Sequence, residues 1–393
     1  MMMEKRILMI GHVDLSKDDA PKVHFSNLAR AFREHGLNVS CILYTPKEKE
    51  FESIGKNITI RFSPNPLFGN VLIRAIKYIL VIPFIIWEFL RFKPQIVYFR
   101  FSPPVSLYLF IIMGFKALPF TFKVIIEFND WVGDQRAIQG ESQFKVLIIK
   151  FLQVMAARFT DYIRVVSEGI KDKLLNYRVV REKIEVIGNG TEVDFLMPMN
   201  KEEAKKLIGV NPNYFYVGFI GNFAIWQGLS YLTLAIPFIL KENKKIRFLF
   251  VGDGPEMSKI KKEISPYKKE DIILTGQVSY KKINNYINAF DIGVAPFIKR
   301  RNDEIGLSPL KIRDYAACGV PIVSSRIRGL EMIEEEGIGI LIPPEDPNSL
   351  ASAILLLSKD EKLRERMGKR GRKLSEEQFS WKIVTKRILE LVF

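Results

Sequence analysis

Lys311 and Asp314 are the residues with the clearest chemical potential, because they lie three positions apart where the sequence predicts the start of a helix. Residues 306–325 read GLSPLKIRDYAACGVPIVSS, with Ser308 as the expected N-cap and Pro309 at the first helical position. Backbone N–H groups and the dipole at a helix start favour an anion, and a lysine there adds positive charge. A carboxylate one turn further on can accept hydrogen bonds from hydroxyl groups. The arrangement suits a nucleoside diphosphate sugar, although a capped helix with an ordinary ion pair shows the same pattern.

The composition is that of a large globular protein. The chain has 393 residues, 48% of them hydrophobic, which is enough to bury the cores of two or three domains. The two cysteines, Cys41 and Cys318, show no CxxC spacing, so neither a disulfide framework nor a zinc site is expected. A reducing cytoplasm fits best, and the short apolar run near the N-terminus does not predict an export signal.

The formal net charge of +15 calls for a partner or surface of opposite sign. Nucleic acid, anionic lipid and anionic small substrates all qualify. The basic residues are dispersed rather than interleaved with aromatic residues in one module, which argues against nucleic acid. The strongest apolar stretch, residues 78–90, contains Pro83 and Glu88 and is shorter than the ~20 residues that span a bilayer. Because basic residues flank it, it is expected to be either an interfacial helix or a helix packed in the core.

The elements that must position these residues alternate between strand and helix. The pattern predicts a strand over 5–13, a helix over 25–35 and a second strand over 37–44, and further strands and helices alternate up to residue 187. Such an opening is typical of a parallel, doubly wound sheet, whose ligands gather beyond the carboxyl ends of the strands. The loop 13–22 is therefore expected at the ligand edge. It lacks GxGxxG, so the usual dinucleotide site is not predicted.

A second α/β domain is predicted to begin with the strand 215–220 and a turn through Gly221 and Asn222. A helix over 228–241, a strand over 246–251 and further alternating elements then lead to the segment 306–325. Glycine and proline residues between positions 188 and 200 indicate that this stretch connects the two domains.

With these motifs in order, the chain resembles the retaining nucleotide-sugar glycosyltransferases of family 4, which have the GT-B fold. The resemblance covers nearly the whole chain and implies two Rossmann-like doubly wound domains facing a central cleft. It implies an acceptor-binding domain over 1–193, a donor-binding domain over 194–375 and a C-terminal helix, 376–393, that packs back on the first domain. The motifs that carry it from residue 186 onward are VIGNGTEVDFLMP, FIGNFAIWQGLSYLTLA, FLFVGDGPE, ILTGQV, INAFDIGVAPF, the segment 306–325 and GIGILIPPEDPNSLASAI.

The family's donor site can be carried over position by position. Asp314 stands where members have a glutamate that holds the donor ribose. A second glutamate that many members carry falls on Gly306, and Glu304 is its nearest substitute. The positions that match the phosphate-facing helix start, the base-contacting turn and the first loop of the donor domain are Gly221, Asn222, Gln227, Gln277, Val278, Ser308, Leu310, Lys311 and Asp314.

Two departures concern the cations that clamp the diphosphate in many members. Where the family commonly shows Gly-Arg and Lys-Gly, this chain has Asn222 after a glycine and Gln227 before one. Neutral amides donate hydrogen bonds but supply no charge, and stabilising the departing diphosphate is the main catalytic task. Either Lys311 takes over together with neighbouring bases, or donor chemistry is weakened. The neighbouring bases are Lys299, Arg300 and Arg326.

In the first domain the resemblance points to His24, Asn129 and Asp130 as catalytic candidates. His24 matches a histidine that many members carry, whereas Asn129 replaces a catalytic-site histidine at the end of the fourth strand. An asparagine can hydrogen-bond a sugar hydroxyl but cannot act as an acid or base at neutral pH. A local contact for His24 and a turn or N-cap role for Asp130 stay open.

The resemblance implies transfer of a sugar from a nucleoside diphosphate sugar to a glycan or lipid-linked acceptor, with retention of anomeric configuration and without a metal or other cofactor. It implies a cytoplasmic protein, and the apolar region 67–92 with its basic flanks adds a peripheral contact with an anionic membrane as an expectation. Nucleic acid is not expected as a partner. Two alternatives stay open: a catalytically silent relative that acts as a binding or scaffold protein, and a nucleotide-sugar epimerase of the same fold.

Overall fold

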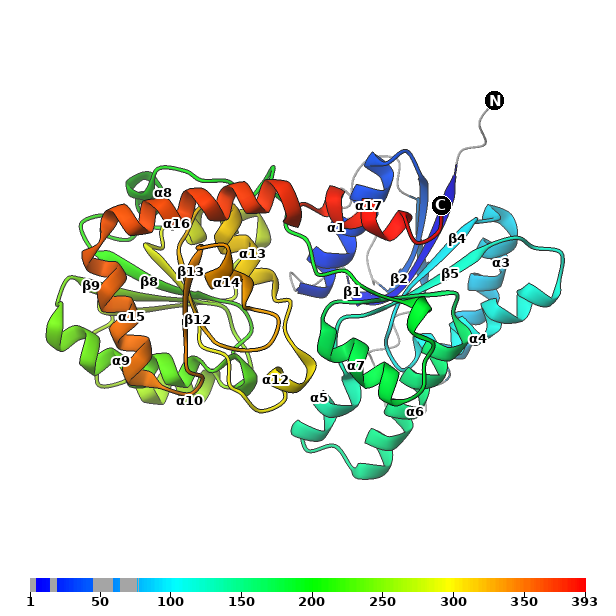
Figure 1. Ribbon diagram of the computed structural model, residues 1–393, viewed down its shortest axis with the longest axis horizontal. Coiled ribbons are helices and arrows are strands. Elements are labelled where there is room, and N and C mark those ends of the chain that lie inside the picture. Colours follow the sequence, from blue (N-terminus) through cyan, green and yellow to red (C-terminus); the bar gives the residue numbers. More distant parts are fainter. Residues whose placement is uncertain (1–4, 15–19, 45–58, 64–75, 77) are drawn as a thin grey trace. The chain divides into compact units, whose positions relative to one another are not determined.

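The computed structural model describes residues 5–14, 20–44, 59–63, 76 and 78–393 (Figure 1). The chain divides into two compact units, of which the first comprises Met1–Gly188 with Trp381–Phe393 and the second Asn189–Ser380. The sequence placed the two boundaries after residues 193 and 375. The observed boundaries differ because Thr191 already hydrogen-bonds within the second unit and Phe379 still packs in the core of that unit.

Within the described residues, the first unit forms a seven-stranded parallel sheet of order β3-β2-β1-β4-β5-β6-β7. Charged residues are rare inside these strands, as expected for a sheet with helices on both faces. The predicted doubly wound sheet is confirmed, and β3 is an edge strand that the sequence pattern missed. The strands are β1 (Arg6–Asp14), β2 (Asn38–Tyr44), β3 (Thr59–Ser63), β4 (Ile96–Arg100), β5 (Lys123–Phe128), β6 (Tyr162–Val165) and β7 (Ile184–Val186).

The helices of the first unit include the long predicted ones, with α6 spanning the expected residues. The predicted apolar stretch 78–90 becomes largely α3, which buries one face and leaves Trp87 and Leu90 exposed, whereas residues 67–75 and 77 lie outside the described residues. No helix of the described residues is both long and apolar enough to cross a membrane. The helices are α1 (Ala20–Glu34), α3 (Ile82–Phe92), α4 (Val105–Gly114), α5 (Val132–Ile138), α6 (Gln143–Phe159), α7 (Glu168–Asn176) and α17 (Trp381–Leu389), the last packed against α1.

The second unit is a six-stranded parallel sheet of order β10-β9-β8-β11-β12-β13, again with helices on both faces. The strands are β8 (Phe215–Ile220), β9 (Ile246–Val251), β10 (Ile272–Gly276), β11 (Ile292–Ala295), β12 (Ile322–Ser325) and β13 (Gly339–Ile342). The helices are α8 (Lys201–Leu207), α9 (Leu229–Glu242), α10 (Met257–Ile264), α11 (Ile283–Asn288), α12 (Asn302–Ile305), α13 (Leu310–Ala317), α14 (Met332–Glu335), α15 (Pro347–Lys359) and α16 (Glu361–Leu374).

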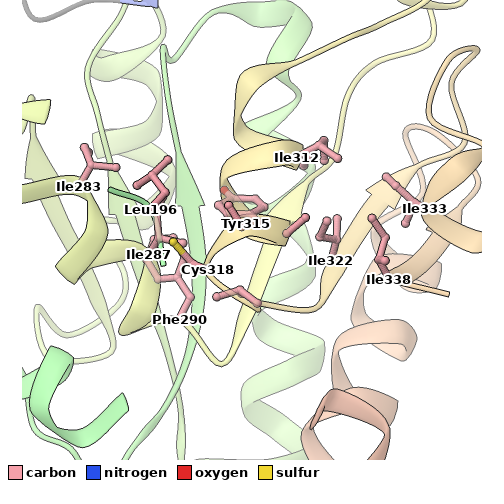
Figure 2. Packing of buried hydrophobic residues seen from close by; sticks show 14 of the residues in the cluster. Leu196, Ile283, Ile287, Phe290, Ile312, Tyr315, Cys318, Ile322, Ile333 and Ile338 are labelled. Atoms are coloured by element: carbon pink, nitrogen blue, oxygen red, sulfur yellow. The ribbon is translucent and has the colours of Figure 1, made fainter. Parts of the chain in front are cut away.

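The core of the second unit consists of one apolar cluster on each face of its sheet, because successive strand residues point to opposite faces. Figure 2 shows the cluster in which Phe290 and Tyr315 pack side by side. Gly218 of β8 makes room for Phe290, since a Cβ atom at this glycine would lie 2.1 Å from Cγ of the phenylalanine ring. The ring therefore sits directly on the strand backbone.

We expect Gly218→Ala to lower the free energy of unfolding by about 1–3 kcal/mol, because the added methyl group overpacks a rigid core. Urea unfolding followed by circular dichroism measures the loss. Gly114→Ala is the control, because a Cβ atom there meets nothing within 4 Å. Equal stability of the two variants would show that the Phe290 ring has room to move.

Candidate functional site

The start of α13 lacks the predicted cap. The helix begins at Leu310, and Pro309 is the cap residue, with an extended ψ of 138° and no side-chain hydrogen bond to the helix. Ser308 does not cap it because its hydroxyl accepts a hydrogen bond from the backbone N–H of Asn189 at 3.0 Å. The carbonyl of Ser308 also accepts from Nδ2 of Asn189 at 2.9 Å. With no capping side chain, the first N–H groups of α13 are suited to an anionic ligand.

Lys311, in the first turn of α13, carries its ammonium group into an apolar surrounding. The residue is only 8% exposed, and Nζ is buried with no hydrogen-bond partner among the described residues. Nζ lies 3.7 Å from the centroid of the Phe219 ring and 5.5 Å from that of Phe297. Burial lowers the pKa of Lys311 well below its usual value. A buried ammonium without a carboxylate partner is stabilised by an anion that binds next to it.

The loop after β8 brings its backbone close to this ammonium. Gly221 has φ of +132°, and a Cβ atom there would lie 3.2 Å from Nζ of Lys311. Tyr315 of α13 fixes the helix to the same strand end, because its hydroxyl accepts a hydrogen bond from the N–H of Ile220 at 3.0 Å. The structure therefore brings together the end of β8, the glycine turn and the start of α13, at the carboxyl edge of the sheet where ligands of this fold class bind.

Asp314 lies one turn beyond Lys311 but is not paired with it. Its Oδ1 accepts a hydrogen bond from Oγ1 of Thr191 at 2.7 Å. Burial raises the pKa of Asp314 to about 7, and the hydrogen bond from Thr191 only partly opposes this. Lys311 and Asp314 therefore do not form the i,i+3 ion pair that their spacing allowed.

The other predicted donor residues differ in how far they are buried. Asn222 is exposed, whereas Gln227 is half-buried and its Oε1 has no hydrogen-bond partner among the described residues. Gln277 is exposed, Val278 packs against the core, and Leu310 is half-buried as the first residue of α13. Of the bases expected to replace the missing cations, Lys299 and Arg300 are exposed, and Arg326 binds Glu334 at 2.6 Å.

Arg301 is a basic residue at this edge that the sequence reasoning missed. It is buried, and its φ of +68° is unusual for a residue other than glycine. Its Cζ lies 5.4 Å from the centroid of the Trp226 ring, next to Gln227 in the chain. Asn302 holds the same loop, since its Nδ2 donates to the carbonyl of Trp226 at 2.9 Å. The sequence KRRND, residues 299–303, contains three adjacent basic residues. Only the fold shows that Arg301 is the buried one.

In the first unit, a buried carboxylate lies at the carboxyl end of β5. Glu127 is in register with Arg100 of β4 and Arg164 of β6, so three charged residues cross the sheet side by side. Nη1 of Arg164 donates to Oε2 of Glu127 at 2.5 Å, and the hydroxyl of Tyr98 donates to the same oxygen. Burial alone would raise the pKa of Glu127, but contacts with His24, Arg164 and Arg100 hold it well below its usual value.

His24 belongs to this group rather than to a local helix-start contact. Its Nε2 lies 2.7 Å from Oε1 of Glu127, and its ring meets that of Trp381 edge-on with centroids 4.9 Å apart. Burial lowers the pKa of His24 despite the neighbouring carboxylate. The sequence reasoning missed Glu127 and Arg164, although a charged residue inside each of the apolar strands FKVIIEF and YIRV was the available signal.

Asn129 and Asp130 form the turn after β5. Nδ2 of Asn129 donates to Oε1 of Glu127, whereas its Oδ1 is buried without a hydrogen-bond partner among the described residues. The buried side chain of Gln153 holds the turn, since its Nε2 donates to the carbonyl of Asp130 at 3.0 Å and its Oε1 accepts from the N–H of Val132 at 3.2 Å. The described residues contain no group of three or more His, Cys, Asp or Glu placed to hold a metal ion.

Comparison with known families identifies both halves of the chain. The family model described as Glycosyltransferase Family 4 matches residues 22–195, and the one described as Glycosyl transferases group 1 matches residues 214–360. An uncharacterized glycosyltransferase of Methanocaldococcus jannaschii is 26% identical over 251 residues, which are 62% of each chain. The capsular polysaccharide biosynthesis glycosyltransferase CapM of Staphylococcus aureus is 25% identical over 252 residues, 61% of this chain and 63% of CapM. The alignments thus cover less than two thirds of the length of each of these two relatives.

Solved structures of similar fold extend over nearly the whole chain. Sucrose-phosphate synthase from Thermosynechococcus elongatus has a TM-score of 0.78 at 17% identity and covers 99% of this chain and 98% of its own. Anabaena HepE in complex with UDP-glucose has a TM-score of 0.73 at 16% identity, with 98% of both chains covered. These likenesses establish the two-domain GT-B fold. The two family matches, which together extend over most of the chain, show that it belongs to family 4 of the glycosyltransferases.

Proposed function

We propose that the protein transfers a sugar from a nucleoside diphosphate sugar to a glycan or lipid-linked acceptor, with retention of anomeric configuration. The observation that carries the proposal is the buried, unpaired ammonium of Lys311 beside Gly221 at the uncapped start of α13. That position calls for an anion, and a diphosphate supplies two charged groups. The structurally similar Anabaena HepE has been solved in complex with UDP and with UDP-glucose, which supports this class of donor.

The second unit would act on the leaving diphosphate. As the bond between the sugar's anomeric carbon and the diphosphate oxygen breaks, negative charge grows on that oxygen. Lys311 and the N–H groups of α13 are placed to stabilise it. Arg301 would add the charge that Asn222 and Gln227 lack, which explains why a strained, buried arginine lies against the loop that contains Gln227. Asp314 would exchange its bond from Thr191 for donor ribose hydroxyls.

The first unit would bind the acceptor. Oδ1 of Asn129 is a buried acceptor of hydrogen bonds that can receive a sugar hydroxyl, while Glu127 holds the amide in place through Nδ2. The acceptor oxygen would bond to the anomeric carbon on the face that the diphosphate leaves, and its proton would pass to the leaving group. We propose that this proceeds without a metal ion, because Lys311 and the helix start already supply positive charge.

The direct test incubates the purified chain with UDP-, GDP-, ADP- and dTDP-sugars in EDTA, with soluble glycan and lipid-linked acceptors. We expect release of nucleoside diphosphate together with a heavier acceptor of retained configuration, observed by mass spectrometry and NMR. Nucleotide binding without release would instead identify a silent binding protein. A changed sugar in the absence of any acceptor would identify an epimerase.

Lys311→Met removes the ammonium and keeps an unbranched apolar side chain. We expect it to weaken UDP binding about 10- to 100-fold, because a charge-assisted hydrogen bond contributes roughly 1.5–3 kcal/mol. Isothermal titration calorimetry measures the affinity. Lys244→Met serves as the control, since Lys244 is exposed and lies just before β9, at the amino end of that strand and not at the carboxyl edge of the sheet. Equal affinities for the two variants would contradict the site.

Asp314 should make the stability of the second unit depend on pH. Its pKa is raised to about 7 in the folded chain, so its contribution is complete below the unfolded pKa of about 4 and is lost as the pH rises through 7. Between about pH 4 and pH 7, the free energy of unfolding should fall by up to about 1.4 kcal/mol per pH unit more in the wild type than in Asp314→Asn, and the difference should level off above about pH 7. Urea unfolding at several pH values checks this, and identical profiles would refute it.

A further inference from the structure

Helix α6 is labelled in the first unit in Figure 1. It exposes large apolar side chains along one face. Phe144, Leu147, Ile148 and Phe151 are between 42% and 74% exposed. Their spacing of three and four residues places them on a single side of the helix. The opposite side is packed into the unit through Val146, Gln153, Val154, Ala156 and Ala157. We call the exposed side, Phe144 to Phe151, the α6 face.

The apolar surface continues onto the neighbouring helix. Phe159, at the end of α6, is exposed and meets Phe110 of α4 edge-on, with ring centroids 5.7 Å apart. Leu107, one turn earlier on α4, is also exposed. A contiguous apolar area of this kind, on a chain whose core already buries many large side chains, marks a contact surface.

The charges around the α6 face are mostly positive. The helix itself contains Lys145, Lys150 and Arg158 and neither Asp nor Glu. The nearest carboxylates are each shared by two cations. Asp134 binds Lys150 at 2.7 Å and Lys173 at 2.5 Å. Glu141 binds Lys145 at 3.1 Å and lies 4.0 Å from Arg136. Cations therefore outnumber carboxylates beside the apolar stripe.

We propose that the α6 face lies on the surface of an anionic lipid bilayer, with its apolar side chains among the acyl chains and its cations at the headgroups. An amphipathic helix with a cationic border is the form that binds such interfaces. A second copy of the chain fits less well, because a two-fold interface would bring the same cations against each other. The proposal deepens the proposed function, since it would bring the enzyme to a lipid-linked acceptor.

The α6 face differs from the segment 67–92 that the sequence favoured for membrane contact. The described part of that segment also exposes large apolar side chains, which are Ile76, Ile79, Leu80, Trp87 and Leu90. The two differ in charge, because α6 contains three cations and no carboxylate, whereas α3 contains Arg91 paired with Glu88 at 3.2 Å.

The test measures co-sedimentation of the full chain with vesicles of phosphatidylcholine alone and of phosphatidylcholine with phosphatidylglycerol. We expect binding to the anionic vesicles at low salt, and a loss of about tenfold or more in Phe144→Ser/Phe151→Ser. The matched control is Leu234→Ser/Phe238→Ser, because these α9 residues are 54% and 51% exposed and, like Phe144 and Phe151, share one face of their helix. The control should bind vesicles like the wild type.

Several outcomes would overturn the proposal: no binding of the wild type, equal binding of the α6 variant, or an equal loss in the α9 control. Analytical ultracentrifugation without lipid measures the oligomeric state and gives a further outcome of this kind. A dimer that only the α6 variant disrupts would make the α6 face a contact between two copies of the chain. UDP affinity and transfer to a soluble acceptor should be unchanged in the α6 variant. If no donor is turned over but vesicle binding still depends on the α6 face, the proposed function fails and the membrane contact stands.

Discussion

The candidate donor site depends on one unfavourable arrangement, the removal of the Lys311 ammonium from water without an anion to compensate it. The surrounding residues make this arrangement tolerable but do not neutralise it. The ring of Phe219 offers its negative face, and Gly221 leaves space where a side chain would stand. Tyr315 keeps α13 from relaxing away from β8. Because burial lowers the pKa of Lys311, an anion that binds beside it would favour the charged form, and the fold holds the amine in position before such a ligand arrives.

Glu127 and Lys311 differ in whether their buried charge is matched within the protein. Glu127 is surrounded by Arg164, Tyr98, His24 and Asn129, so its charge is matched within the protein. Lys311 has no such partner among the described residues. Under the proposed function, the contrast is between a charge that is matched within the fold and one that a bound substrate would match. His24, which the resemblance made a catalytic candidate, lies beside this matched carboxylate.

Much of the fold followed from local patterns, whereas the site depended on contacts that no local pattern encodes. The strands 215–220 and 246–251 were predicted with the bounds that the structure shows, because apolar runs and flanking turns are local signals. The cap at Ser308 was wrong because Asn189, more than a hundred positions away, takes its hydroxyl. Likewise, the sequence alone does not distinguish Arg301 from the adjacent basic residues Lys299 and Arg300. Its buried position depends on packing near Trp226, which is distant in the sequence.

The row of Arg100, Glu127 and Arg164 across β4, β5 and β6 has a consequence for how the first sheet assembles. These strands are otherwise almost uniformly apolar, so hydrophobic burial alone would tolerate a shifted alignment of neighbouring strands. A slip by one residue would send Glu127 to the other face of its neighbours and leave a charge buried and unmatched, at a cost of roughly 3–5 kcal/mol. The three charged residues thus help to specify the strand register. A shifted register would be destabilised during folding, and the native register is the one in which the three charges lie side by side.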